Sequence, residues 1–370
     1  MGVQYVLYGA TLVVAVAISS VIGRQRGRAS TNRSGGHRMV ATVPTTAGEV
    51  DVEDLGVVLM HEHVFIRTEP LQWGWPGFGG WDEENEVAAA RKRLGLLKRA
   101  GVDTILDMTV PGLGRDPALV ARAVDGTGLN VMCATGYYTY DDLPFPFHYR
   151  GPGKLLDADD HVLESLFERD VTVGIGDTGI RAAVLKVVTD QQGMTEDVER
   201  LTRAIANVHM RTGRVICTHA HAQTQRGLEQ QRIFSEHGVD LGRVVIGHSN
   251  ETTDLDYLRR LIDNGSYVGW DRCGLDVIVP LADQLDTLAE LCQRGYASRL
   301  MLSHDKASFT DWFPASETDA FLPSWQYTYI NNGVLPGLRD RGVADDQIEQ
   351  ILVRNPRDFF AQADAYTRRR

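Results

Sequence analysis

Two histidines separated by one residue, His61 and His63, directly follow the apolar run 55–60. On a β-strand, residues two positions apart project from the same face, about 7 Å apart along the backbone. Two neutral imidazoles placed in this way can bind one metal ion together. The same pattern also arises by chance in exposed loops. It therefore predicts a metal site only if further ligands follow later apolar runs.

Further candidate ligands do follow later apolar runs. They are Lys186, His219, His248 and Asp305. Each of them alone is more typical of a hydrogen-bonded core residue. Together with the first two histidines they make six ligands, enough for two metal ions. Such mixed nitrogen and oxygen donors suit Zn, Co, Mn or Fe and exclude none of these metals.

Lys186 lies inside the apolar run 182–188, where a charged ammonium would be costly to desolvate. One interpretation is a lysine that reaches the strand end or pairs with a buried aspartate. The other is a lysine converted by CO2 to a carbamate, because desolvation lowers the pKa of the amine and leaves it neutral and reactive. A carbamate would be an anionic bridge between two cations. The neighbouring histidines and aspartate favour this second interpretation.

The elements that must position these side chains are short apolar runs alternating with longer amphipathic segments. This alternation predicts a single (β/α)8 barrel of the TIM type, with the site at the carboxyl ends of its strands. An open doubly wound sheet would need a glycine-rich phosphate loop after the first strand, and this strand ends in His61-Glu62-His63 instead. The predicted strands are 56–60, 104–109, 130–135, 182–188, 214–218, 243–247, 266–270 and 300–303. The predicted helices are 82–100, 117–125, 159–170, 195–211, 227–237, 253–264 and 281–294, with a helical tail after the last strand.

The composition of the chain limits the kinds of molecule that it is expected to bind. The chain has 370 residues, of which 43% are hydrophobic, and a net charge of −11. The negative charge argues against nucleic acid and anionic lipid, and it favours a small neutral substrate. Four cysteines show no CxxC spacing, which is typical of reduced core thiols in a cytosolic protein.

Residues 1–38 differ from the rest of the chain. The stretch 3–23 is almost wholly apolar, long enough to span a bilayer, and Arg24, Arg26 and Arg28 follow it. This order of charges would keep the catalytic body in the cytoplasm. The segment is interpreted either as a membrane tether or as the product of a wrongly assigned start, with Met39 as the true first residue. In both cases the catalytic domain is predicted to be 39–370 and cytoplasmic.

The motifs along the chain resemble those of the phosphotriesterase family in the amidohydrolase superfamily, and most closely its phosphotriesterase-like lactonases. The likeness runs from about Val43 to Phe360. It is carried by the segments 59–63, 109–116, 134–140, 227–233, 246–248, 269–272, 303–305 and 355–356.

The resemblance implies a binuclear metal centre on the barrel, with zinc as the expected metal. By this resemblance His61, His63 and Asp305 would hold a buried ion. His219 and His248 would hold a more exposed ion, and carboxylated Lys186 would bridge the two. A hydroxide between the ions would attack the substrate, and Asp305 would carry the proton to the leaving group.

Three features favour the lactonase branch. Tyr138 falls where those lactonases keep a tyrosine that orients the lactone ring, Arg272 matches the arginine of their seventh-strand motif, and Trp312 falls where a tryptophan meets the acyl chain. The loop after Asp305 also looks short. The resemblance therefore implies hydrolysis of N-acyl homoserine lactones (quorum quenching), with phosphotriester hydrolysis as a side activity. The segment 306–309 departs from many relatives, which leaves the chain-length preference open.

Several alternatives stay open. The main activity could be that of an organophosphate phosphotriesterase, or the barrel could be a membrane-tethered binding protein without turnover. Arg272 would either contact the substrate or pair with Asp271. His221 and His304 are interpreted as supporting or structural residues. An aromatic cluster predicts loop packing or the contact of a homodimer, as the family implies; it comprises Trp73, Trp75, Phe78 and Trp81.

Overall fold

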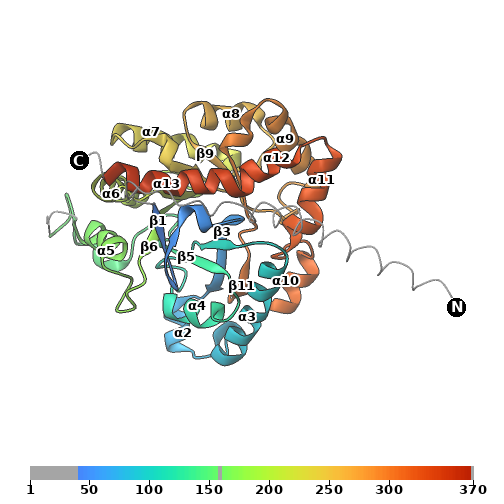
Figure 1. Ribbon diagram of the computed structural model, residues 1–370. Helices are drawn as coiled ribbons and strands as arrows, with labels where there is room; N and C mark the ends of the chain where they lie inside the picture. Colours follow the sequence, from blue (N-terminus) through green and yellow to red (C-terminus); the bar gives the residue numbers. More distant parts are fainter. Residues whose placement is uncertain (1–40, 157–160, 368–370) are drawn as a thin grey trace, which may run out of the picture.

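A computed structural model describes residues 41–156 and 161–367 (Figure 1). The predicted apolar segment 3–23 lies outside the described residues. Within the described ranges, no helix combines the length and the apolar character that crossing a bilayer requires.

A curled parallel sheet is the centre of the fold. Its strands follow one another in chain order, each pairing in parallel with the next, and a further short strand, β11 (Ala307–Thr310), pairs with the first one. At the other edge the backbone N–H of Asp305 donates to the carbonyl of His61 (3.0 Å), so the last strand returns to the first. The architecture is TIM-barrel-like. The eight strands of the predicted barrel are β3 (Val58–Ile66), β4 (Thr104–Asp107), β5 (Asn130–Gly136), β6 (Ala182–Thr189), β7 (Ile216–Ala220), β8 (Val244–Ile246), β9 (Tyr267–Trp270) and β10 (Leu300–Leu302).

Helices follow the strands and pack on the outside of the sheet (Figure 1). Several begin at a residue whose side chain accepts a backbone N–H of the first turn, such as Asp116, Thr195 and Asp254. The helices that alternate with the strands are α3 (Glu83–Arg99), α4 (Pro117–Val124), α5 (His161–Thr172), α6 (Glu196–Thr212), α7 (Arg226–Glu236), α8 (Leu255–Asp263) and α9 (Leu281–Gln293). The others are α2 (Glu69–Gly74), α10 (Ala315–Phe321), α11 (Leu335–Asp340), α12 (Asp345–Glu349) and α13 (Asn355–Thr367).

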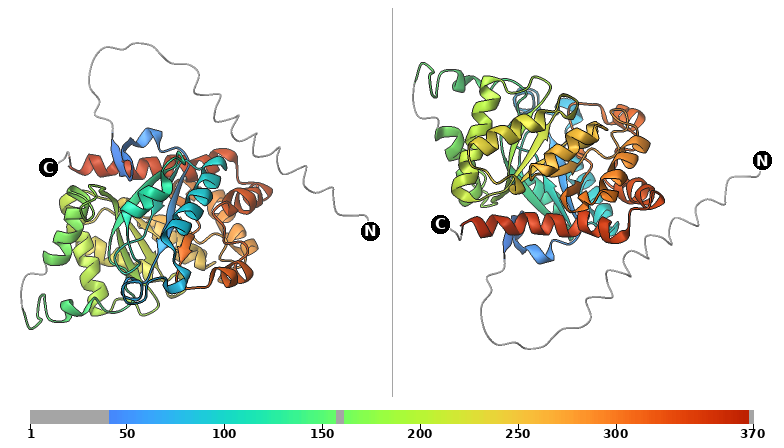
Figure 2. Two further views of the ribbon diagram at one scale, coloured as in Figure 1. Left: turned by 90° about the horizontal axis from the view of Figure 1, so that it is seen from below. Right: turned by 90° about the horizontal axis from the view of Figure 1, so that it is seen from above.

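Alternation along the strands divides the core into two layers. Leu59, Ile105 and Leu185 belong to the layer between sheet and helices, whereas Met60 and Val184 fill the interior of the sheet. The hairpin of β1 (Thr42–Thr45) and β2 (Gly48–Asp51) lies beside α13 (Figure 2), and both contribute to the interior layer. These segments therefore cover the end of the barrel opposite to the strand ends that carry the candidate ligands.

Two sequence predictions need correction. The first strand does not end at Met60, because β3 runs on through the two histidines to Ile66, and its final residues pair with β11. The segment after Asp305 is not a short loop either, since it contains β11 and α10 before the helix that begins at Ile330. The other seven predicted strands and the seven predicted helices are confirmed to within a few residues.

Candidate metal centre

The six candidate ligands meet at the carboxyl ends of the strands. His61 and His63 lie on β3, Lys186 on β6 and His219 on β7, while His248 and Asp305 follow β8 and β10. An Oδ atom of Asp305 lies 3.5 Å from Nε2 of His61, 3.2 Å from Nε2 of His63 and 3.8 Å from Nε2 of His248. The Lys186 Nζ atom lies 3.5 Å from Nε2 of His61. The ring centres of His219 and His248 are 4.4 Å apart.

A shift of register turns the two histidines of β3 toward this centre. Leu59 pairs with Ile105 and Glu62 with Asp107, so β3 carries one extra residue between these two pairs. Such a bulge changes which side chains face inward. It explains why Met60 fills the interior and the next residue, His61, nevertheless reaches the centre.

One carboxylate holds the outer nitrogen of two of the histidines. Asp271, at the end of β9, accepts the Nδ1–H of His61 (3.1 Å) and the Nδ1–H of His248 (2.9 Å). The Nε2 atoms of both rings consequently face the centre with a free lone pair. The sequence analysis assigned no such function to Asp271, although its place at a strand end was a usable signal.

The other two imidazoles also have outer partners. The Nδ1 atom of His63 lies 2.8 Å from the hydroxyl of Thr109, and Nε2 of His219 lies 2.6 Å from Asp190. Hydrogen bonds of this kind fix the tautomer and orientation of metal-binding histidines. The sequence analysis missed these partners because they come from loops whose course depends on the tertiary fold.

Burial keeps the imidazoles neutral. It lowers the pKa of His61 and of His248 well below the usual value, and the charges of Lys186 and Arg272 add to the effect. Burial also lowers the pKa of His219 to about 4. Neutral imidazole is the form that binds metal ions, so these side chains are ready to act as ligands at neutral pH.

Lys186 is fully buried, and among the described residues no carboxylate lies at hydrogen-bond distance from it. Its Nζ donates to the carbonyl of Met108 (3.0 Å). Burial lowers its pKa to about 8. The close approach of β5 to the lysine backbone depends on Gly136, where a Cβ atom would lie 2.0 Å from the Lys186 carbonyl oxygen. Of the two interpretations of Lys186, the one that pairs it with a buried aspartate is not supported, because its Nζ donates to a backbone carbonyl.

Asp305 and His248 adopt a left-handed backbone, with φ of 54° and 57°. Non-glycine residues in this region are uncommon and gather at functional sites. Burial would raise the pKa of Asp305, but the charged Arg272 guanidinium beside it helps to hold this pKa well below its usual value. Asp305 is therefore a carboxylate.

Arg272 lies over this carboxylate. Its Nε donates to Oδ2 of Asp305 (2.9 Å), and a second nitrogen pairs with Glu251. The alternative partner considered from the sequence, Asp271, is wrong, because that carboxylate is occupied by the two histidines.

A cavity of about 250 Å³ opens above the candidate ligands. Tyr138 and Tyr140 line it, with their hydroxyl oxygens 2.6 Å apart. Trp312 also lines it, and its ring centre lies 6.1 Å from that of Tyr138. Other lining residues are apolar, among them Leu275 and Ile278. All the residues predicted to contact substrate therefore border one cavity.

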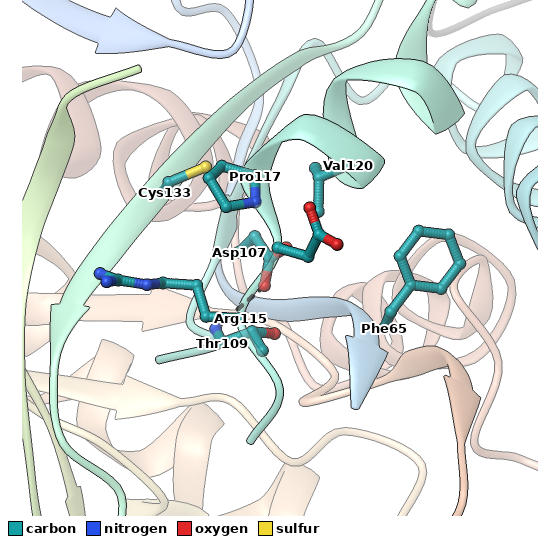
Figure 3. A pocket seen from close by; sticks show the side chains of 8 residues that line it. Phe65, Asp107, Thr109, Arg115, Pro117, Val120 and Cys133 are labelled. Carbon is teal, nitrogen blue, oxygen red and sulfur yellow. Dashed lines mark hydrogen bonds between the residues drawn. The ribbon is translucent and has the colours of Figure 1, made fainter. Parts of the chain in front are cut away.

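A second, much smaller cavity lies behind His63 and is shown in Figure 3. It is lined by Asp107, Thr109, Arg115 and Cys133, and its volume of about 10 Å³ suits one water molecule at most. Asp107 accepts the backbone N–H of Thr109 (2.9 Å). This cavity is too small for a substrate.

The residues present fit a binuclear centre. Among the described residues, His61, His63 and Asp305 bring three ligand atoms within 4.8 Å of one another, as do His61, His248 and Asp271. In the second group the hydrogen bonds to Asp271 already occupy the Nδ1 atoms. The first group, with free Nε2 atoms and an ionised carboxylate, is the better match to a divalent ion.

The remaining sequence candidates lie apart from the centre. His304 is buried, donates to Glu62 (2.7 Å) and accepts the N–H of Ile330 (3.0 Å), and His221 contacts Thr224. Trp81 packs against Phe65 and Phe309, whereas Trp73 and Trp75 are exposed. The four cysteines are buried and free, as expected.

Comparison with known proteins identifies a common family. The model of the phosphotriesterase family matches residues 41–360. A phosphotriesterase homology protein of Mycobacterium tuberculosis is 50% identical over 322 residues, covering 87% of this chain and 98% of that protein. An aryldialkylphosphatase of Saccharolobus solfataricus is 37% identical over 317 residues, covering 84% and 97%.

Solved structures agree with this result. The phosphotriesterase from Mycobacterium tuberculosis matches with a TM-score of 0.84 at 50% identity, covering 86% of this chain and 98% of that one. A structure from the engineering of organophosphate hydrolysis on a weak promiscuous lactonase template matches with a TM-score of 0.78 at 31% identity, covering 86% and 99%.

Proposed function

The chain belongs to the phosphotriesterase family, and from this premise we propose that it is a metal-dependent hydrolase that opens lactone rings. The observation that carries the proposal is the position of Tyr138. Its ring lies 6.0 Å from that of His219, and its hydroxyl borders the apolar cavity above the candidate ligands. A phenol at this place can donate to a carbonyl oxygen of a substrate held over the centre.

Two divalent ions are proposed as cofactors, zinc first and cobalt, manganese or iron as alternatives. His61, His63 and Asp305 would hold one ion, and His219 and His248 the other. When bound, the ions would supply hydroxide at neutral pH and polarise the bond under attack.

Lys186 is proposed to bridge the ions as a carbamate. Its neutral amine adds to the carbon of CO2, a C–O π pair moves to oxygen, and the nitrogen gives up one proton to solvent water. The pKa of about 8 supplies the neutral amine that this step requires.

Tyr138, Asp305 and Arg272 would bind the substrate and transfer the proton. Burial, followed by the neighbouring Tyr140, raises the pKa of Tyr138 well above its usual value, so the phenol keeps its proton and acts as a donor. Asp305, ionised and 2.9 Å from the Arg272 Nε, would accept the proton of the attacking water and deliver it to the leaving alkoxide. Arg272 would fix the direction of that carboxylate.

N-acyl homoserine lactones are the proposed substrates. Leu275, Ile278 and Trp312 offer an apolar surface from the centre to the mouth of the cavity, where Trp312 is 44% exposed. An acyl chain would bury apolar surface there. A role in quorum quenching would follow from this substrate class.

Phosphotriester hydrolysis is the second candidate. It is supported by the relative named aryldialkylphosphatase, and the phosphorus centre is tetrahedral like the intermediate of lactone hydrolysis. We propose it as a side activity. A barrel that only binds metal or ligand, tethered to a membrane through 3–23, would be the alternative from another class.

The remaining proposals concern the whole protein. The catalytic domain is proposed to be 39–370 and to act in the cytoplasm. A homodimer is proposed to form through the exposed Trp73 and Trp75, because large exposed aromatic side chains are enriched at protein interfaces.

The variant Tyr138→Phe tests the proposed substrate class. Its kcat/KM for an acyl homoserine lactone is expected to fall about 100- to 1,000-fold through loss of one donor, with a smaller fall for paraoxon. Tyr137→Phe, a neighbouring tyrosine that does not line the cavity, is the matched control and should match the wild type. Equal falls for both substrates would contradict the assignment of the lactone as the main substrate.

A further inference from the structure

Asp271 connects the two halves of the candidate metal centre. Its side chain is buried, and it directly follows β9, between the strands β8 and β10 after which His248 and Asp305 stand. Oδ2 accepts the Nδ1–H of His61 (3.1 Å), while Oδ1 accepts both the backbone N–H (2.6 Å) and the Nδ1–H (2.9 Å) of His248. One carboxylate thus contacts one histidine from each proposed ion group.

Two glycines leave the space that this carboxylate occupies. A Cβ atom at Gly269 would lie 2.6 Å from Oδ2 of Asp271, and one at Gly247 would lie 2.9 Å from the same oxygen. Real Cβ atoms do not approach so closely. The position of Asp271 is therefore built into the backbone of two neighbouring strands, which argues against an accidental contact.

The two acceptor oxygens determine where the imidazole protons lie. In its ionised form Asp271 can only accept hydrogen bonds, and both rings then carry their proton on Nδ1 and direct the Nε2 lone pair toward the centre. We propose that Asp271 is a positioning residue that sets the metal-binding tautomer of both His61 and His248. This inference rests on the proposed two-ion assignment.

The two oxygens of Asp271 accept unequal numbers of hydrogen bonds, two from His248 and one from His61. In Asp271→Asn the amide oxygen would stay on the side of His248, where it keeps two donors, and the NH2 group would face His61. The Nδ1 atom of His61 would then have to accept a hydrogen bond from this NH2 group, and the ring proton would move to Nε2. The ring could no longer bind the ion proposed for His61, His63 and Asp305. Asp271→Ala would instead release both rings.

Metal binding to the full chain tests this inference. The wild type, freed of metal and titrated with Co²⁺ in bicarbonate buffer, should bind two equivalents by elemental analysis and visible absorption. Asp271→Asn should keep one site near the wild-type affinity and weaken the other about 10–100-fold. Asp271→Ala should weaken both. The control Asp276→Asn, whose carboxylate accepts the hydroxyl of Tyr329 (3.2 Å) instead of a ligand histidine, should bind two equivalents with the wild-type affinities.

The tautomers themselves provide a second readout that does not depend on activity, and its wild-type arm needs no variant to fold. In ¹⁵N-histidine spectra of the metal-free wild type, His61 and His248 should both be protonated on Nδ1, and in Asp271→Asn only His61 should change. An Nε2–H form of either ring in the wild type, or two unaltered sites in Asp271→Asn, would overturn the inference. Fewer than two equivalents in the wild type would refute the two-ion assignment instead, while the tautomers would still test Asp271.

Discussion

At the scale of single residues, burial gives Lys186 the reactivity that its sequence position predicts. The amine is enclosed in the barrel and donates to a backbone carbonyl, and within the described part of the chain no carboxylate lies at hydrogen-bond distance. Its pKa falls to about 8, mainly by desolvation. Because only the neutral amine reacts with CO2, formation of the carbamate should depend on pH.

Carboxylation of Lys186 is expected to be favoured above pH 8 and suppressed at lower pH. At pH 6, two units below its pKa of about 8, about one amine in a hundred is neutral. The measurement is the ¹³C signal of a carbamate in metal-free protein under ¹³CO2 at fixed partial pressure, between pH 6 and 9. The signal should rise with pH and be missing in Lys186→Met. A signal of equal strength at pH 6, or one that persists in the variant, would contradict the role of this lysine.

Asp305 is expected to be required for turnover and dispensable for folding. Asp305→Asn removes the proton acceptor, and kcat should fall about 100- to 10,000-fold. Arg272 keeps its partner Glu251, so the fold should survive. Circular dichroism and thermal unfolding provide the control for folding. A variant with nearly wild-type kcat would exclude Asp305 as the proton carrier.

The sequence predicted all six candidate ligands because metal-binding residue types stand at the ends of apolar runs. It did not predict their partners. Simple alternation from Met60, which faces the interior, would turn His61 outward, and only the bulge in β3 brings it in. The pairing of Arg272 with Asp305 depends likewise on how two distant loops meet.

At the scale of elements, Gly136 allows β5 and β6 to meet beside the lysine. Its φ is +146°, and a Cβ atom would lie 2.0 Å from the carbonyl oxygen of Lys186. Gly136→Ala should therefore cost about 2–4 kcal/mol of unfolding free energy, measured by urea denaturation of metal-free protein. Gly126→Ala, also at positive φ (+75°) but with nothing within 4 Å, should cost about 1 kcal/mol. Equal costs for the two variants would contradict the close approach.

Hydrogen bonds to Asp311 connect the segment after β11 to the chain that follows β3. Asp311 accepts the backbone N–H and the hydroxyl of Thr68 (2.6 and 3.0 Å) and the amide of Gln72 (3.1 Å). Since Trp312 is the next residue, these hydrogen bonds hold the wall of the cavity in place.

Asp311→Ala is expected to raise KM for a lactone several-fold with little change in kcat, because the wall of the cavity loosens while the metal centre is untouched. Steady-state kinetics measures both constants. Ser308→Ala on the same strand, which loses only a contact with exposed Arg93, is the control. A fall in kcat at constant KM would show that the segment acts on chemistry instead.

The seven later strands and the alternating helices could be predicted because their patterns are local. Strand β11 could not, since four residues, Ala307–Thr310, form a strand only by pairing with the end of β3. The β1–β2 hairpin could not be predicted either, because its apolar side chains are buried only by contact with α13 and the barrel interior.

At the scale of the whole molecule, the residues that stabilise the barrel and the candidate ligands lie in different places. The two core layers and the hairpin with α13 occupy the body and one end, and the candidate ligands occupy the other end. Loops from distant parts of the chain therefore shape the substrate cavity on a fixed set of strand ends. The family is established by this whole-chain likeness, whereas the substrate depends on a few side chains around one cavity.

The central claim is that a two-ion centre beneath Tyr138 hydrolyses lactones in preference to phosphotriesters. The most direct measurement is kcat/KM of the wild type, reconstituted with zinc or cobalt and bicarbonate, on acyl homoserine lactones of several chain lengths and on paraoxon in parallel. We expect lactone efficiency well above paraoxon efficiency, with both activities lost after chelation. A higher efficiency on paraoxon would contradict the claim and identify an organophosphate hydrolase.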